Sequence, residues 1–164
     1  MRTFPRGTTT SRRGRRGNAM VEFALSFGIL FAAFTGVYQF GYAYYTYNNL
    51  ETAIRAAGRY AAERTYDSAS STPSTAYTDA VRNMVLTGDP TTPPRGVNQQ
   101  EGKYAIVRVN PDNIRVRMTF VDNVPAEVTV DVVNYPMDAF FKSFTLNGKP
   151  AVTFPFIGRW DPVN

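Results

Sequence analysis

The first part of the chain is a long apolar run that begins abruptly after a basic segment. Asn18 to Phe40 supplies 23 residues, and a helix needs roughly 20 mainly apolar residues to cross a bilayer. From Phe23 to Asn49 the chain contains no Asp, Glu, Lys or Arg. Glu22 is the one charge inside the run, and a carboxylate in a membrane span is by default a candidate functional residue. The pattern predicts a single transmembrane helix.

Small residues recur within this run at a spacing that is common in packed membrane helices. Ala24 and Gly28 are four positions apart, and so are Ala32 and Gly36. Glycine would weaken a soluble helix, but small residues let membrane helices approach one another closely. We therefore expect these four residues to serve in helix packing.

Helical periodicity continues beyond the apolar run. Opposite charges at i and i+4, as in Glu51 and Arg55, mark the solvated side of this second half. A helix from Asn18 to about Tyr66 would be roughly 73 Å long, with its first half in lipid and its second half packed on a soluble domain. The apolar residues of the second half fall on one helical stripe: Leu50, Ala53, Ile54, Ala57 and Ala61.

A loop and a second, shorter helix are predicted next. Thr72 and Pro73 are the expected N-cap and first turn, and Gly88 is the expected stop. The segment Asp89 to Lys103 holds three prolines and two glycines without periodicity, which predicts a surface connector. A binding loop is the alternative interpretation of that segment.

The remainder of the chain predicts an antiparallel sheet. Alternation places Arg115 and Asp131 in one row on the outer face, with Thr119 beside Glu127, and leaves an apolar face that the long helix should cover. Arg108 is expected in the same charged row. The expected elements are strands at Tyr104 to Val109, Ile114 to Val121 and Glu127 to Val133, a short helix from Pro136 carrying Phe140 and Phe141, and a final edge strand at Ala151 to Ile157 interrupted by Pro155.

Together these elements predict an α+β protein: a long N-terminal helix, transmembrane in its first half, with a small antiparallel-sheet head domain. The expected divisions are a basic leader at 1–17, a transmembrane helix segment at 18–47, an amphipathic continuation of the helix at 48–66, and an α+β head domain at 67–164.

The net charge of +5 does not indicate a nucleic-acid partner once the charges are located. Six of the 18 basic residues lie in the first 17 positions, which contain no acid. The remainder carries 12 basic and 13 acidic residues, a charge near −1, so a basic face for nucleic acid is not expected.

Composition also restricts the chemistry. Cysteine and histidine are absent, which excludes disulfides, thiolate chemistry and imidazole bases, and zinc sites of the usual kind. The clustered carboxylates Asp122, Glu127 and Asp131 could form a calcium site or an acid pair, but opposite arginines they indicate cross-strand ion pairs. We expect no catalytic residue, no metal and no cofactor: the chain is not predicted to be an enzyme.

Flanking residues predict the orientation of the span. Arginines precede it and are scarce just after it, which places the N-terminus in the cytoplasm and the C-terminal part outside. An aromatic belt follows at the far interface. An ordinary secretory signal cut near Ala43 and a plain uncleaved anchor remain alternatives, although signal cores run only about 7 to 15 residues. The belt consists of Tyr38, Tyr42, Tyr44, Tyr45 and Tyr47.

The start of the run resembles the processing site of a type IV-like prepilin: a basic leader ends in a glycine, with glutamate at mature position +5 and phenylalanine at +6. The segment from Asn18 to Ala62 resembles the TadE-like family, pilin-related proteins of tight-adherence (Flp-type) pili. The shared motifs are Val-Glu-Phe-Ala at 21–24, Tyr-Gln-Phe-Gly at 38–41 and Ala-Ile-Arg-Ala-Ala-Gly-Arg-Tyr-Ala-Ala at 53–62.

The resemblance implies a pilin-like lollipop layout and a minor pilin-like subunit that supports pilus assembly and surface adhesion. A prepilin peptidase would cut between Gly17 and Asn18. Glu22 would then pair with the N-terminal amine of an adjacent subunit, the alternatives being a partner in its own chain or the lipid headgroups. Phe23 would be a packing residue of the filament.

The implied partners are the prepilin peptidase, other pilin and minor pilin subunits, an inner-membrane assembly platform and the lipid bilayer of the cytoplasmic membrane, with no nucleic acid. A hypothesis of a different class is a membrane-tethered extracytoplasmic binding domain that never enters a filament.

Overall fold

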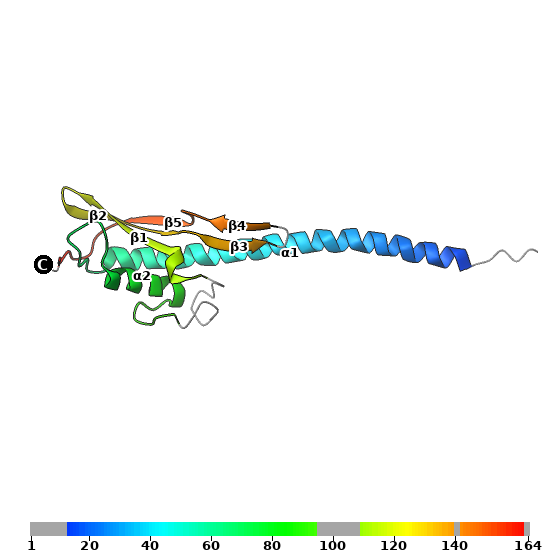
Figure 1. Ribbon diagram of the computed structural model, residues 1–164, viewed down its shortest axis with the longest axis horizontal. Coiled ribbons are helices and arrows are strands. Elements are labelled where there is room, and N and C mark those ends of the chain that lie inside the picture. The colour runs from blue at the N-terminus through cyan, green and yellow to red at the C-terminus, as the bar shows by residue number, and fades with distance from the viewer. Residues whose placement is uncertain (1–12, 95–108, 140–141, 163–164) are drawn as a thin grey trace, which may run out of the picture. The chain divides into compact units, whose positions relative to one another are not determined.

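The computed structural model describes residues 13–94, 109–139 and 142–162. The chain divides into two units, Met1–Phe40 and Gly41–Asn164, the second of which we call the head unit. One helix, α1 (Arg13–Glu63), contributes to both (Figure 1). The predicted long N-terminal helix is therefore confirmed, although it ends at Glu63 and not near Tyr66.

In the head unit, α1 is joined by α2 (Thr75–Thr87), the 3-10 turn η1 (Pro111–Asn113) and five strands. A three-stranded antiparallel sheet has the order β1-β2-β5, and β3 pairs with β4 in a separate antiparallel ribbon. The predicted α+β class is confirmed. The strands are β1 (Ile114–Val121), β2 (Val124–Val132), β3 (Tyr135–Ala139), β4 (Lys142–Leu146) and β5 (Ala151–Pro155).

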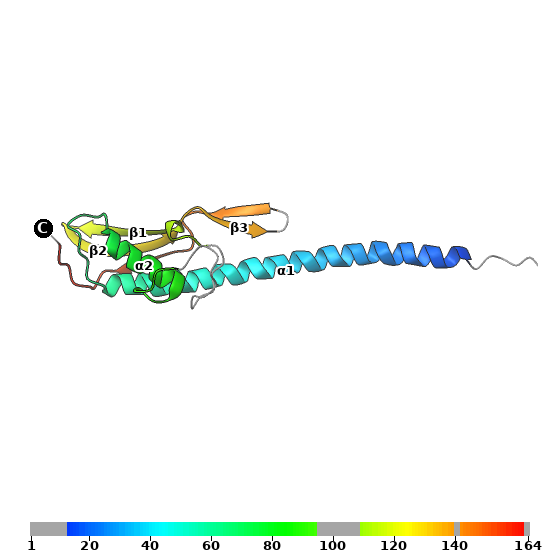
Figure 2. The same ribbon diagram turned by 60° about the horizontal axis from the view of Figure 1, so that its bottom comes forward.

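The core lies between the three-stranded sheet and the helices, which both pack on one face of it (Figures 1 and 2). The predicted stripe of α1 is fully buried: Leu50, Ala53, Ile54, Ala57 and Ala61 are each 0% exposed. Alternate residues of the strands close the core from the sheet side, as their period of two predicts. They are Ile114, Val116 and Met118 from β1 and Val128, Val130 and Val132 from β2.

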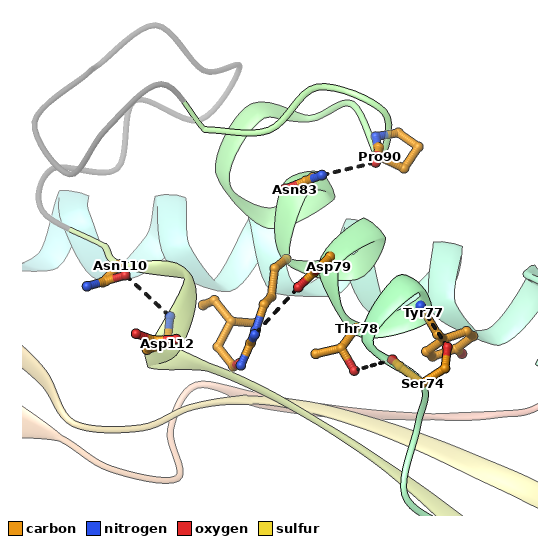
Figure 3. Close-up of polar contacts among 10 residues, drawn as sticks. Ser74, Tyr77, Thr78, Asp79, Asn83, Pro90, Asn110 and Asp112 are labelled. Carbon is orange, nitrogen blue, oxygen red and sulfur yellow. Dashed lines mark hydrogen bonds and ion pairs between the residues drawn. The ribbon is translucent and has the colours of Figure 1, made fainter. Parts of the chain in front are cut away.

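Local caps mark the two ends of α2, and a contact with the C-terminal segment lies just beyond the end of α1. The predicted N-cap at Thr72 is wrong: Ser74 caps α2, and its Oγ accepts a hydrogen bond from the Tyr77 N–H at 3.1 Å (Figure 3). The predicted stop at Gly88 is confirmed, because this glycine has φ 77° and caps α2 in the left-handed region. The chain leaves α1 before Tyr66 because Tyr66 N–H donates to the Arg159 carbonyl of the C-terminal segment.

The predicted register of β1 and β2 is correct. Arg115 stands opposite Asp131 and Thr119 opposite Glu127. The Arg115 guanidinium binds both carboxylate oxygens of Asp131, which is 1% exposed. This pairing raises the pKa of Arg115, because the carboxylate stabilises the charged guanidinium. The interpretation of Asp131 as a cross-strand ion-pair residue is therefore confirmed.

Other strand predictions need correction. β2 begins at Val124 and not at Glu127, because Asp122 and Asn123 form a two-residue turn with φ of 51° and 62°. The final strand ends at Pro155, on the edge of the sheet as predicted, and not at Ile157.

The predicted short helix at Pro136 is also wrong, because that residue lies in β3 and pairs with Thr145. Phe140, Phe141, Arg108 and the predicted strand at Tyr104 to Val109, apart from Val109 itself, lie outside the described residues.

Candidate membrane and assembly segment

Glu22 lies on the exposed surface of α1. Among the residues that the structure describes, none forms a hydrogen bond or an ion pair with its carboxylate. Its neighbours along the helix, Val21 and Phe23, are also exposed, at 60% and 70%. A carboxylate in this position, within an apolar and exposed helix surface, is expensive to place in hydrocarbon unless a cation accompanies it.

Three phenylalanines form a ladder on one side of the helix. The rings of Phe23 and Phe27 stack with centroids 5.9 Å apart, and those of Phe27 and Phe31 stack at 6.1 Å. Residues at i and i+4 lie one above the other on a helix, which makes the ladder possible. All three rings are exposed, so the ladder presents a continuous aromatic surface. Of the three, only Phe23 is among the predicted packing residues, although Phe27 and Phe31 follow it in the sequence at the same four-residue spacing.

The small residues of α1 fall into two structural groups. A Cβ added to Gly28 or Gly36 would meet no atom within 4 Å, so no contact with the described residues requires a glycine at these positions. Ala24 and Ala32, at the same spacing, are exposed as well. The structure therefore places all four predicted packing residues on the surface of α1, and its described residues give no steric reason for a glycine at 28 or 36.

Gly58 belongs to the other group. A Cβ at this position would lie 2.8 Å from Val152 Cγ2 and 3.0 Å from Phe154 Cδ2, both in β5. Its small size lets α1 approach the sheet, so its role is to hold the head unit together. Gly58 is not among the predicted packing residues, although a glycine inside the otherwise helical Ala53 to Ala62 motif is a signal of close packing.

Gly17 and Asn18, the residues of the predicted cleavage site, are exposed and helical. α1 begins at Arg13, so this bond lies inside the first turns of the helix and not before them as the sequence predicted. The bond is therefore exposed to solvent within the helix, near its N-terminal end.

The rest of α1 supports placement in a membrane. Among the described residues, the part of α1 from Gly17 to Glu63 is the one helix long and apolar enough to span a bilayer. Its threonine hydroxyls donate to carbonyls of the preceding turn, as Thr35 Oγ1 does to the Phe31 carbonyl at 2.8 Å. Such back-bonding is how a hydroxyl remains paired in an apolar environment.

Comparison with known proteins bears on the same segment. The family described as TadE-like protein matches residues 17–59. The matched residues begin at the predicted cleavage glycine, include Glu22 and the phenylalanine ladder, and extend through Gly58. No curated protein and no solved structure matches the chain. The predicted resemblance is confirmed over this segment: residues 17–59 are similar to the family described as TadE-like protein.

Proposed function

We propose that this protein is a minor pilin-like subunit of a tight-adherence (Flp-type) pilus. A prepilin peptidase removes residues 1–17, α1 holds the mature subunit in the cytoplasmic membrane, and the head unit lies outside the cytoplasm. An assembly platform in the membrane then transfers the subunit into a filament that supports surface adhesion. The TadE-like segment and the single apolar helix support this proposal.

Glu22 is the residue that most supports assembly into a filament. It is the one acid in the apolar run, it is exposed, and the described part of the chain offers it no partner. Cleavage after Gly17 would create an ammonium group on Asn18, and an unmodified terminal amine is charged at neutral pH. Each charge alone bears a large desolvation cost in an apolar environment, and pairing offsets part of both costs. An ion pair between the Asn18 amine of one subunit and the Glu22 carboxylate of the next would therefore fix the axial register of neighbouring subunits.

The exposed surfaces of α1 suit a bundle of packed helices. Gly28 and Gly36 each lower intrinsic helix stability by about 1 kcal/mol relative to alanine. No contact in the described chain requires either glycine. A neighbouring helix that approaches closely would compensate for this cost, and the phenylalanine ladder would supply apolar area for the same packing.

The charge pattern supports the orientation. Six arginines lie before Gly17, and the 27 residues from Phe23 to Asn49 carry no charge. Positive residues remain on the cytoplasmic side, so the head unit is translocated.

Replacement of Glu22 tests the proposal. Glu22→Gln keeps the size of the side chain and removes its charge, so membrane insertion should persist or improve. The neighbouring amine would be left buried and unpaired, at a cost of about 3–5 kcal/mol, so recovery in sheared pili should fall more than about tenfold.

Glu51→Gln is the matched control. It removes a charge from the same helix, but Glu51 pairs with Arg55 within its own chain and is partly solvated. An exposed i,i+4 pair contributes about 0.3–0.5 kcal/mol, so this variant should enter pili normally. Normal incorporation of the Glu22→Gln variant would show that Glu22 has no pairing role in assembly.

A further inference from the structure

The β3–β4 ribbon extends the long axis of the head unit. β2 leads directly into β3 and β4 leads back into β5, so the two pairings form one long hairpin interrupted near Asn134 and Gly148. Both views show β3 and β4 running past β1, toward the end of the head unit at which α1 enters it (Figures 1 and 2).

One face of this ribbon is apolar and becomes steadily more exposed along its length. Paired residues share a face, so Tyr135 with Leu146 and Met137 with Phe144 form one surface. Tyr135 is 3% exposed and belongs to the core, Met137 is half-buried, and Phe144 is 53% exposed. The apolar surface therefore continues past the end of the core.

Tyrosines of α1 are exposed at the same end of the head unit. Tyr42, Tyr44 and Tyr45 are the first aromatic residues of this unit, and all three are exposed. They directly follow the apolar run, because Phe40 is its last residue. The start of α1 in the head unit is therefore an aromatic band that is covalently continuous with the membrane segment.

We propose that the β3–β4 ribbon rests on the bilayer surface, with Phe144 and the adjoining apolar face in the headgroup region beside the α1 tyrosines. Aromatic side chains favour this interface, where an apolar ring can be buried while polar groups stay hydrated. The opposite face of the ribbon suits contact with water, because Pro136, Ser143 and Thr145 are exposed on it.

The proposed contact between the ribbon and the bilayer does not require anionic lipid. The sequence from 135 to 146 contains one acidic and one basic residue, so no excess positive charge calls for an anionic headgroup. The inference rests on the part of the proposed function that puts α1 in a membrane, and not on filament assembly.

The absence of cysteine makes the test direct, because a single cysteine can be introduced without removing others. The full chain carrying Phe144→Cys is labelled with an environment-sensitive fluorophore and reconstituted in phosphatidylcholine vesicles, at no more than one chain per vesicle. Brominated phosphatidylcholine serves as the quencher of lipid-exposed labels.

Labels at two further positions distinguish failure of the ribbon contact from failure of the membrane span. Val124→Cys is the matched control, because Val124 is an apolar residue of similar exposure (51%) that lies in the β1–β2 hairpin. Leu30→Cys reports on α1 within the apolar run.

We expect blue-shifted emission and loss of most intensity to brominated lipid at positions 30 and 144, and neither effect at position 124. Adding phosphatidylglycerol should not change the quenching at 144. Quenching at 30 but not at 144 would overturn this inference and leave the membrane span intact, whereas no quenching at 30 would contradict the span itself. Equal quenching at 124 and 144, or a blue shift at 144 without lipid quenching, would also overturn the proposed contact.

Discussion

Gly58 of α1 and Val152 of β5 face each other so closely that a Cβ on Gly58 would lie 2.8 Å from Val152 Cγ2. This contact joins the helix that carries the membrane segment to the edge strand of the head sheet. Gly28 lies in the same helix, yet a Cβ there would meet no atom of the described chain. Gly58 therefore packs within its own chain, whereas the role proposed for Gly28 is packing against a neighbouring subunit.

Gly58→Leu should destabilise the head unit. The added side chain would have to displace Val152 and Phe154 from the sheet, and overpacking of this kind costs about 1–3 kcal/mol or more. Thermal unfolding of the full chain in detergent, followed by near-ultraviolet circular dichroism, measures the change. Gly28→Leu is the control and should leave the unfolding temperature unchanged. Similar unfolding temperatures for Gly58→Leu and wild type would show that α1 does not pack on β5 as described.

Removal of the buried helix stripe should have a larger effect on the head. A truncated chain that starts near Tyr47 keeps Leu50 and Ile54, which are both 0% exposed. One that starts at Asp67 loses them, and each large apolar side chain contributes about 1.5–3 kcal/mol by its burial. We expect the first chain to be monomeric and to melt cooperatively without detergent, and the second to aggregate. Equal solubility and stability of the two would contradict the role of α1 as the cover of the sheet.

The stability of the head should fall at alkaline pH because of Tyr77. This side chain is buried, donates to the Ala61 carbonyl and lies against the Tyr66 ring at 5.2 Å. Burial raises the pKa of Tyr77, and also that of Tyr66, because the charged phenolate is disfavoured in the core. Below the unfolded pKa of about 10 both states keep the proton. Above it the unfolded state loses the proton first, so stability is lost as pH rises through the folded pKa.

Tyr77→Phe separates the titration from the packing. It removes one hydrogen bond, so it should cost about 1 kcal/mol at neutral pH. Its stability should then fall less steeply than that of wild type above about pH 10. Tyr44→Phe, at an exposed position, should retain the wild-type profile. Urea unfolding at a series of pH values measures these differences, and parallel profiles for wild type and Tyr77→Phe would refute the assignment to Tyr77.

Several parts of the fold could be predicted from the sequence because they follow from local periodicity. The buried stripe from Leu50 to Ala61 follows from a period of 3.6 residues, and the pairing of Arg115 with Asp131 from a period of two. Gly88 could be predicted because a helix that ends in the left-handed region favours glycine.

The errors lie where distant segments decide the local structure. Pro136 was predicted to begin a helix, but β4 pairs with its segment and draws it into β3. The end of α1 is set by the hydrogen bond between Tyr66 and Arg159, which local pattern cannot indicate. A glycine inside a helical pattern marks Gly58 as unusual, but the pattern cannot show that it packs on Val152, which is remote in sequence.

The assembly site was predicted mainly by one anomaly, Glu22, the acid that an apolar helix should not contain. Its proposed partner is a terminus of another subunit, so neither the pattern nor the fold of a single chain can display that contact.

Gly17→Leu should block processing. The glycines at 7 and 14 are not followed five positions later by an acid, whereas Gly17 is followed by Glu22. A large residue before the scissile bond should therefore leave the slower-migrating precursor in the membrane, as judged by immunoblotting. Gly14→Leu, in the same basic leader, should be processed normally. Mature protein of normal size from Gly17→Leu would mean that the cleavage site is elsewhere.

The proposal as a whole is tested most directly by the N-terminus of this protein in sheared and purified surface fibres. Mass spectrometry of the fibre-associated protein should find a mature chain that starts at Asn18, five residues after Arg13, where α1 begins. That single result would show that the chain is cleaved after Gly17, that Glu22 is residue +5 of the mature protein, and that the mature protein enters a filament. A chain that retains its leader in the fibres, or one that is present in the membrane and absent from the fibres, would contradict the account and favour a membrane-tethered binding domain.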